Sequence, residues 1–249
     1  MYDVSEVLAR IDDHLPIVIA LTLVAWVCGF VQIVEALRLG RRDSVPGAPI
    51  VMTAFLFAHD ATFVARYDMW FNVVGHWYFQ VFWFGMFGAV AVELLLIQQF
   101  LVLGHRAIAP NLPRWAFTVS FVLFQIFVLV ALWWIQALLD DPLTLVTLTL
   151  VSVAAVVPLA PWILTRGSTR GQSRLFAWAA LLGPGSLVLG LTPVICAAFD
   201  TISYYAVVVS VFALAITYLA LLEFYRRNEK RHGFDGVAAV GPAVIHEHG

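Results

Sequence analysis

Seven apolar runs, each long enough to cross a lipid bilayer, limit the fold of this sequence more than any other feature. A hydrocarbon layer about 30 Å thick requires about 20 apolar residues in a helix. A lipid-facing β-barrel would instead alternate polar and apolar residues. We therefore predict an all-α membrane protein, a seven-transmembrane-helix bundle. The predicted spans are 15–39, 48–67, 76–103, 113–139, 142–165, 173–198 and 201–225.

The positions of the basic residues predict how the bundle is oriented. Of the 14 Lys and Arg residues, all but Arg10 and Arg66 fall at alternate ends of the predicted spans. Because Lys and Arg concentrate in cytoplasmic loops, we expect the N-terminus outside and the C-terminus in the cytoplasm. The first span follows an acidic segment without a cleavage site, so we expect it to remain as a helix.

Composition also predicts the domain organisation and location. Hydrophobic residues make up 62% of the 249 residues and charged residues 12%, which is unlike a soluble domain. We expect a transmembrane domain over 1–231 and a disordered cytoplasmic tail over 232–249. The protein would be multi-pass in the plasma membrane of a bacterium or in the endoplasmic reticulum of a eukaryote. Membrane lipids are then partners, and the basic residues, as topological anchors, give no reason to expect nucleic acid.

Two interruptions stand out along the chain. Pro184 and Pro193 fall within the sixth predicted span, and each lacks a backbone donor. The carbonyl groups they free must be satisfied by protein, water or a ligand. The connection around Trp70 and Phe71, which precedes Trp77, is typical of a segment that lies at the membrane interface.

The sequence lacks the common cofactor and metal motifs. CxxC, HExxH, GxGxxG and Walker-type loops are absent, and Cys28 and Cys196 are typical of small buried side chains. We therefore expect no cofactor and no metal. A haem or metal site that uses the scattered histidines is a weaker alternative, and its candidate ligands are His59, His76 and His105.

His59 and Asp60 interrupt the apolar run of the second span, AFLFAHDATFVARYDMWF. An ionisable residue inside a membrane costs several kcal/mol unless it is paired, neutral or hydrated, so Asp60 is a functional candidate. Apolar walls favour a protonated carboxyl group, which donates hydrogen bonds and acts as a general acid. His59 would pair with this acid or reload it with a proton.

Counting 1.5 Å per residue along each span predicts a pocket at the level of Asp60, in the outer half of the bundle. Aromatic faces around an acid stabilise a substrate that becomes cationic, although Trp and Tyr near an interface also form aromatic belts. The same count assigns Glu93 to the inner half. The expected substrate-binding residues are Trp26, Phe63, Gln80, Trp83, Trp133, Trp134, Gln136, Tyr204, Tyr205 and Thr217.

The stretch LTRGSTRGQSRLFAW, residues 164–178, resembles the cytoplasmic loop between the fifth and sixth helices of the integral-membrane terpene cyclases of fungal indole-diterpene and meroterpenoid pathways. Chain length and span number are also similar. The resemblance implies a lipophilic terpenoid substrate and an acid that protonates an epoxide or alkene to start cationic ring closure. Spacing places the Trp–Glu pair of that family on His59 and Asp60. The family's Asp in the seventh span falls near Ile216, beside Thr217, so Glu93 and Asp200 are the candidates for a second acid.

We therefore expect a membrane-embedded terpene cyclase or isomerase that works without a cofactor, with Asp60 as general acid and His59 as its partner. The alternative is a small proton-coupled carrier or lipid-binding membrane protein. In that case Asp60 would couple protons, and the interrupted sixth span would act as a gate.

Overall fold

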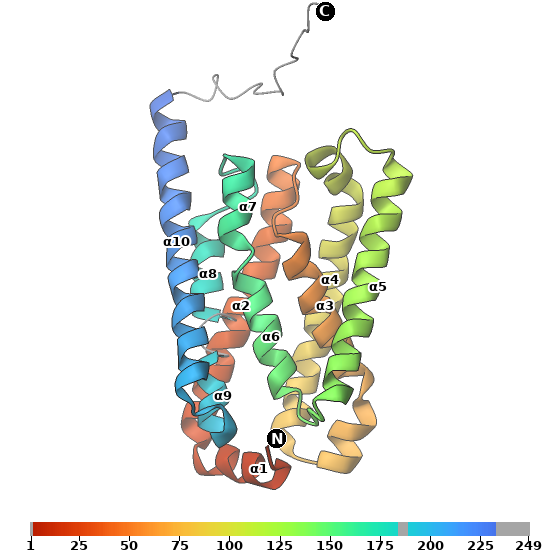
Figure 1. Cartoon of the computed structure of the whole chain (residues 1–249), viewed down its shortest axis with the longest axis vertical. Helices are drawn as coiled ribbons and strands as arrows, with labels where there is room; N and C mark the ends of the chain where they lie inside the picture. Colours follow the sequence, from red (N-terminus) through yellow and green to blue (C-terminus); the bar gives the residue numbers. More distant parts are fainter. Residues whose placement is uncertain (1, 184–188, 233–249) are drawn as a thin grey trace, which may run out of the picture.

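A computed structural model describes residues 2–183 and 189–232, and in this part of the chain every regular element is a helix. The predicted all-helical class is confirmed. Pro184 and residues 233–249 of the predicted tail lie outside the described residues. Five helical segments are long and apolar enough to cross a membrane, and they run roughly parallel along the long axis (Figure 1). They are α2 (Leu15–Asp43), α4 (Trp77–Ile108), α5 (Arg114–Leu138), α6 with α7 (Leu145–Arg166) and α10 (Ile202–His232).

Helix α3 (Ile50–Ala65) is shorter and lies among the longer helices, where it packs against α4, α5 and α6. Ala54 and Ala58 are fully buried on α3 and form a cluster with Val128, Leu132 and Val151. Small side chains let helix backbones approach closely, which matters where lipid supplies no hydrophobic driving force. The sequence around Asp60 is therefore held in the centre of the bundle.

Two of the predicted spans are broken in the structure. The run predicted over 142–165 forms α6 (Leu145–Val156) and α7 (Leu159–Arg166), which are separated at Pro158 because proline cannot donate a backbone hydrogen bond. The run predicted over 173–198 forms α8 (Arg174–Leu182), α9 (Leu189–Ile195) and a 3₁₀ turn, η3 (Ala197–Phe199).

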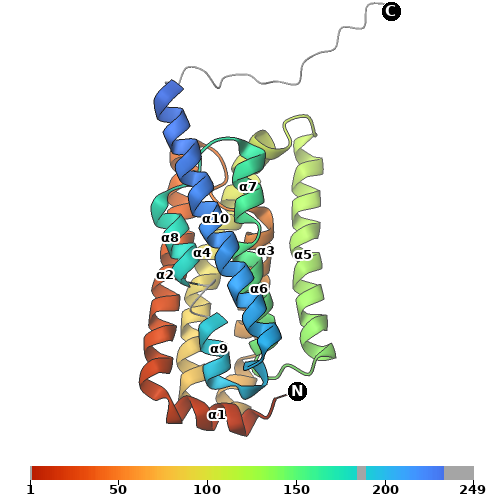
Figure 2. The ribbon, with the colours of Figure 1, turned by 60° about the vertical axis from the view of Figure 1, so that its left-hand side comes forward.

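An amphipathic N-terminal helix, α1 (Val4–Asp13), was not expected from the sequence. Asp3 caps it by accepting a hydrogen bond from the Ser5 backbone N–H at 2.8 Å. Its apolar side chains Val7 and Ile11 are buried against the end of the bundle. Figures 1 and 2 both place α1 across this end, and α1 contacts α9.

Helix α1 supplies donors to carbonyl groups at the end of α9. Arg10 donates from Nε to the Val194 carbonyl at 3.1 Å and from Nη2 to the Pro193 carbonyl at 3.3 Å. The last carbonyls of a helix have no partner within it and need donors from elsewhere. The carbonyl that Pro193 itself frees, that of Leu189, accepts a hydrogen bond from the Tyr204 hydroxyl at 3.0 Å, so protein supplies its partner.

The N-terminal residues also fasten the connection between α5 and α6. The Tyr2 hydroxyl donates to Asp141 Oδ1 at 2.5 Å and accepts from the Leu143 backbone N–H at 3.0 Å. Burial, and then the neighbouring Asp141 carboxylate, raises the pKa of the Tyr2 phenol, so the phenol remains a donor at neutral pH. Two separate parts of the bundle are thus joined by residues 2–13.

The connection between α3 and α4 includes a short π-helix, η1 (Met69–Val74). The interfacial prediction is wrong for Trp70, which is fully buried. Its ring stacks on Phe63 with centroids 4.1 Å apart, and its Nε1–H donates to the Phe63 carbonyl at 2.7 Å. A carbonyl near the end of α3 thus gives the buried indole the acceptor that it needs.

Ion pairs fix the opposite end of the bundle. Glu35 accepts two hydrogen bonds from Arg38, at 2.6 and 2.7 Å, and a third from the Ser173 hydroxyl. Glu223 pairs with Arg174 at 2.5 Å. Both glutamates are thus paired with arginine. They also hold the 164–178 loop against α2 and α10.

Replacing Arg10 tests its role at the end of α9. We expect Arg10→Gln to lower the free energy of unfolding by about 1–3 kcal/mol, since two carbonyls lose a charged donor. Thermal unfolding of the purified protein in detergent should show this as a lower Tm. The matched control is Arg41→Gln, because Arg41 is exposed and has no hydrogen-bond partner among the described residues. Equal Tm values for the two variants would contradict this role.

Candidate functional site

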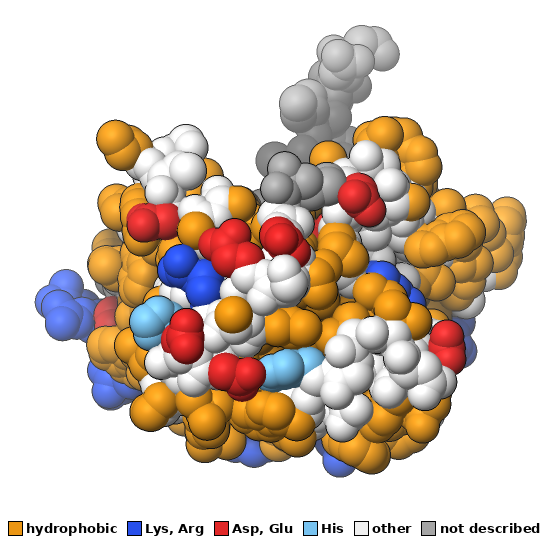
Figure 3. Space-filling view, turned by 90° about the horizontal axis from the view of Figure 1, so that it is seen from below, with side chains coloured by type: hydrophobic (Ala, Val, Ile, Leu, Met, Phe, Trp, Pro, Cys, Tyr) orange, Lys and Arg blue, Asp and Glu red, His pale blue; other side chains and the backbone are white. Residues whose placement is uncertain are grey.

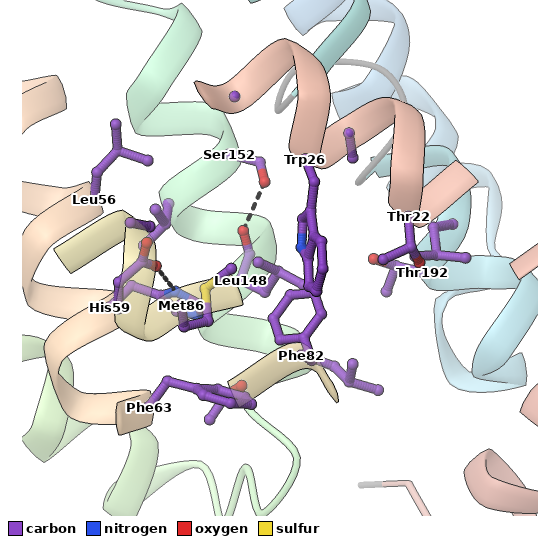
Figure 4. Close-up of a pocket in the computed structure, with 18 of the residues that line it drawn as sticks. Thr22, Trp26, Leu56, His59, Phe63, Phe82, Met86, Leu148, Ser152 and Thr192 are labelled. Carbon is purple, nitrogen blue, oxygen red and sulfur yellow. Dashed lines mark hydrogen bonds and ion pairs between the residues drawn. The ribbon is translucent and has the colours of Figure 1, made fainter. Parts of the chain in front are cut away.

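An apolar cavity of about 120 Å³ lies beside α3, at the level of His59 and Asp60 (Figure 4). Side chains from α2, α3, α4, α6 and α9 line it, together with residues of the connection before α6. Figure 4 shows Trp26 and Phe82 across the cavity from His59. The aromatic residues in the wall are Trp26, Phe30, Phe63, Tyr78, Phe79 and Phe82.

Of the predicted site residues, the structure brings five to this cavity: Trp26, His59, Asp60, Phe63 and Glu93. His59 and Glu93 are each 1% exposed, and Asp60 is 6% exposed. These three therefore form a buried polar cluster in an otherwise apolar wall. Hydrophobic side chains separate the cluster from solvent, so its charge state depends on the groups within it.

His59 and Asp60 are neighbours in the chain and also pair with each other. Their side chains leave the helix about 100° apart, yet His59 Nδ1 lies 2.7 Å from Asp60 Oδ1. His59 Nε2 is buried and has no hydrogen-bond partner in the described part of the chain. The contact with Asp60 thus fixes one ring nitrogen and leaves the other available to a molecule in the cavity.

Glu93 meets Asp60 from the opposite helix. Both side chains line the cavity, and the Asp60 carboxyl group is the electrostatic neighbour of Glu93. Neither Glu93 oxygen has a hydrogen-bond partner in the described part of the chain. Two carboxylates this close in an apolar environment cannot both be ionised. Because apolar walls exclude water, a charge on this cluster would be costly.

This meeting differs from the sequence analysis, which placed Glu93 in the inner half of the bundle. Glu93 lies about 24 Å along α4 from its first residue, whereas Asp60 lies only about 7.5 Å before the last residue of α3. Asp60 and Glu93 lie at the same depth in the bundle because the last residue of α3 lies deeper than the first residue of α4. Residues 66–76, which include η1, cover the difference.

Several cavity residues were not predicted, although a periodic pattern marks them. Tyr78, Phe82, Met86, Ala89 and Glu93 line the cavity and recur at intervals of three or four residues along α4. Such spacing places side chains on one face of a helix. Reading outward from Glu93 would have identified this face from the sequence.

Tyr78 adds a polar contact to the wall. Its hydroxyl lies 2.8 Å from Thr22 Oγ1, which comes from α2. Trp26, one turn further along α2, packs so tightly against α4 that a side chain at Gly85 would lie 2.5 Å from the indole ring. The Trp26 Nε1–H is buried and has no partner among the described residues. It joins His59 and Glu93 as a polar side chain in this wall that has a buried atom without a hydrogen bond.

The other predicted residues lie outside this cavity. Trp133 and Trp134 are 66% and 61% exposed on α5, which agrees with the aromatic-belt alternative. Trp83 Nε1 donates to the Val64 carbonyl at 2.9 Å, away from the cavity. The remaining residues outside the cavity are Gln80, Gln136, Asp200, Tyr204, Tyr205 and Thr217.

Specific contacts account for most of these positions. Gln136 donates to Thr147 Oγ1 at 3.2 Å, and the Tyr204 hydroxyl donates to the Leu189 carbonyl at 3.0 Å. The Tyr205 hydroxyl bonds to Asp200 at 3.0 Å on the exposed end of α10. Asp200 is therefore distant from the cavity, and Glu93 is the candidate second acid that the structure places next to Asp60.

The histidine-based metal alternative is not supported by the arrangement of the described residues. His76 immediately precedes α4 and His105 lies near its far end, which separates them by about 43 Å. His59 therefore cannot share a site with both. Within the described ranges, three or more His, Cys, Asp or Glu side chains do not gather where a metal ion could bind.

The chain matches no protein-family model, no curated protein and no solved structure. Function is therefore inferred from the cavity, its three ionisable side chains and its aromatic wall.

Infrared spectroscopy tests the uncharged state of the cluster. We expect the wild-type protein at neutral pH to show the C=O stretching absorption of protonated carboxylic acids, because charge in this cavity has no compensating solvent. Asp60→Asn and Glu93→Gln should each remove part of this absorption. Glu6→Gln, at an exposed position of α1, should leave it unchanged. Absence of the acid absorption at neutral pH would contradict the assigned protonation.

Proposed function

We propose that this chain crosses the membrane seven times, with its N-terminus outside and its C-terminus in the cytoplasm. The five long segments would be joined by α3 and by α8 with α9 as the remaining spans. Acidic side chains gather at the end that carries α1 (Figure 3), and the arginine-rich loops lie at the other end. This distribution supports the orientation. The membrane would be the bacterial plasma membrane or the eukaryotic endoplasmic reticulum.

We further propose that the cavity is the active site of a terpene cyclase or isomerase acting on a lipophilic terpenoid. The observation that carries this proposal is the buried Asp60–Glu93 carboxyl pair in an aromatic cavity. A carboxyl group that stays protonated in apolar surroundings can act as a general acid toward a bound group. The aromatic faces would stabilise the carbocation without forming a bond to it.

Asp60 would transfer its proton to an epoxide oxygen as the carbon–oxygen bond breaks, or to an alkene carbon. The resulting cation would draw the π electrons of a neighbouring alkene into a new carbon–carbon bond. Glu93 and the Nδ1–H of His59 would then stabilise the Asp60 carboxylate by donating hydrogen bonds. The charge left on Asp60 would thus be shared among the three side chains.

His59 Nε2 would act as the base in the last step of the reaction. It has no partner in the described part of the chain and would accept the proton that the final cation loses as its product alkene forms. Transfer of the Nδ1 proton to Asp60 would then restore the acid and leave His59 neutral with its proton on Nε2. Proton exchange with water would return this proton to Nδ1 before the next turnover, so that the reaction neither consumes nor releases protons overall. Such an isomerisation requires no cofactor and no cosubstrate.

A proton-coupled carrier or a lipid-binding membrane protein is the second candidate. The same carboxyl pair favours it, since buried acids that share protons are common in proton-driven transport. Transport of a lipophilic compound would depend on a proton gradient across a closed membrane. Cyclisation would proceed equally well in detergent, where no gradient exists.

Substitution of Asp60 tests the enzymatic proposal. We expect wild-type protein in detergent to convert a member of a panel of linear terpenoid epoxides and polyenes into cyclic products of equal mass. Asp60→Asn should lower the rate by about 10²–10⁴-fold, because the amide cannot supply the proton. Gas chromatography with mass spectrometry measures both rates.

Asp13→Asn is the control for this experiment, since Asp13 is exposed on α1. It should retain the wild-type rate, and all three proteins should elute identically on size exclusion. Normal turnover by Asp60→Asn would exclude Asp60 as the acid. If no substrate is cyclised and uptake into proteoliposomes follows a proton gradient, the carrier proposal replaces the enzyme.

A further inference from the structure

A second cleft, with a volume of about 270 Å³, lies outside the cavity at the end of the bundle that carries α1. It is formed where α3 and α5 end and where the connection to α6 begins. Figure 1 shows this connection near the N-terminus. The residues that line the cleft are Arg66, Trp133, Gln136, Ala137, Asp140, Asp141 and Pro142.

Arg66 is held in position, but most of its guanidinium donors make no hydrogen bond within the described residues. Its Nη2 donates to the Pro142 carbonyl at 3.1 Å, and the guanidinium carbon lies 5.3 Å from the centre of the Trp70 ring. Within residues 2–183 and 189–232, the other guanidinium nitrogens make no hydrogen bond, and Arg66 forms no ion pair. A fixed guanidinium group with free N–H donors is suited to bind an anion.

The two acidic residues of the cleft differ in whether their carboxylates have hydrogen-bond partners. Asp141 is buried and accepts hydrogen bonds from the Tyr2 hydroxyl and, at 2.9 Å, from the Thr147 backbone N–H. Asp140 is exposed, and its carboxylate has no partner among the described residues. Its backbone has a φ of 46°, which asparagine and aspartate tolerate better than most residues. The cleft therefore offers a guanidinium group that has donors to spare and the Asp141 carboxylate as its electrostatic neighbour, and an exposed Asp140 carboxylate that does not pair with it.

Aromatic side chains indicate the level of this cleft in the membrane. Trp133 lines it and is 66% exposed, and Trp134 beside it is 61% exposed. Exposed Trp side chains near the end of a membrane-spanning helix occupy the headgroup region. The molecules that surround the protein at this level carry polar headgroups.

We propose that the cleft binds the headgroup of a phospholipid that contains phosphoethanolamine. Arg66 would donate hydrogen bonds to the phosphate, and Asp140 would accept them from the primary ammonium group. This inference rests on the proposed membrane placement and is independent of the proposed reaction. A choline headgroup has no N–H to donate, and a glycerol headgroup carries no cation, so neither satisfies both side chains.

Native mass spectrometry of the full chain tests this site. Protein is released from nanodiscs that contain equal amounts of lipids with ethanolamine, choline and glycerol headgroups and identical acyl chains. We expect wild-type protein to retain the ethanolamine lipid about tenfold more than either other lipid. Arg66→Gln should abolish this retention, whereas Arg114→Gln, at an exposed residue on the opposite end of α5, should preserve it.

Asp140→Asn is the decisive variant, because Asp140 is exposed and makes no side-chain contact that folding would require. It should lose the preference for ethanolamine over glycerol headgroups but keep binding to phosphate through Arg66. Asp13→Asn serves as its control. Equal retention of the three lipids by the wild type, or an unchanged preference in Asp140→Asn, would overturn the proposal.

A soluble competitor identifies the source of the headgroup. If the acyl chains contribute to binding, free phosphoethanolamine should displace the lipid only at a concentration at least about a hundredfold higher. Displacement at equal concentration would show that the cleft binds the free compound and would overturn the assignment to a lipid.

Discussion

The meeting of the Asp60 and Glu93 carboxyl groups inside an apolar cavity is the constraint on which the proposed chemistry depends. Burying a carboxylate in apolar surroundings is costly, and two that lie close together also repel each other if both are charged. His59 completes the cluster by pairing with Asp60 at 2.7 Å. Any molecule that enters the cavity therefore meets two buried carboxyl groups, an imidazole nitrogen without a partner among the described residues, and aromatic walls.

The helices around the cluster are arranged so that these side chains stay together. Short α3 is enclosed by longer helices, and its alanines allow close packing. At one end, Tyr2 and Arg10 join α1 to the α5–α6 connection and to α9. At the other end, Glu35 links Arg38 with Ser173. Polar contacts at both ends thus support a cavity whose own wall is mainly apolar.

The sequence predicted the features that depend on composition and local periodicity. Apolar runs predicted an all-helical chain, and the cost of a buried acid identified Asp60 before any contact was known. The levels of residues on different helices were predicted less well. Glu93 was assigned to another depth because the length of a connection does not reveal how far it extends beyond a helix end. The burial of Trp70 was missed for a similar reason, since its partner is a backbone carbonyl of α3.

The aromatic wall shows the same limit of prediction. Trp133 and Trp134 are at the expected distance along α5, but their side chains are exposed. The prediction missed this because a residue's depth along a helix does not indicate which face of the helix it occupies. Tyr78 and Phe82 lie on the face of α4 that also carries Glu93, and their spacing was available in the sequence. Periodicity measured from a buried ionisable residue is therefore a better guide to a cavity wall than depth alone.

The most direct test of the account is to compare the binding of a cationic and a neutral molecule of the same shape. A terpenoid in which a protonated tertiary amine replaces the carbon that would become cationic imitates the proposed intermediate. Isothermal titration in detergent would compare it with the hydrocarbon analogue. The account predicts that the amine binds at least about tenfold more tightly, through the aromatic rings and the carboxyl pair. Equal affinity for the two molecules would contradict a cavity that stabilises positive charge.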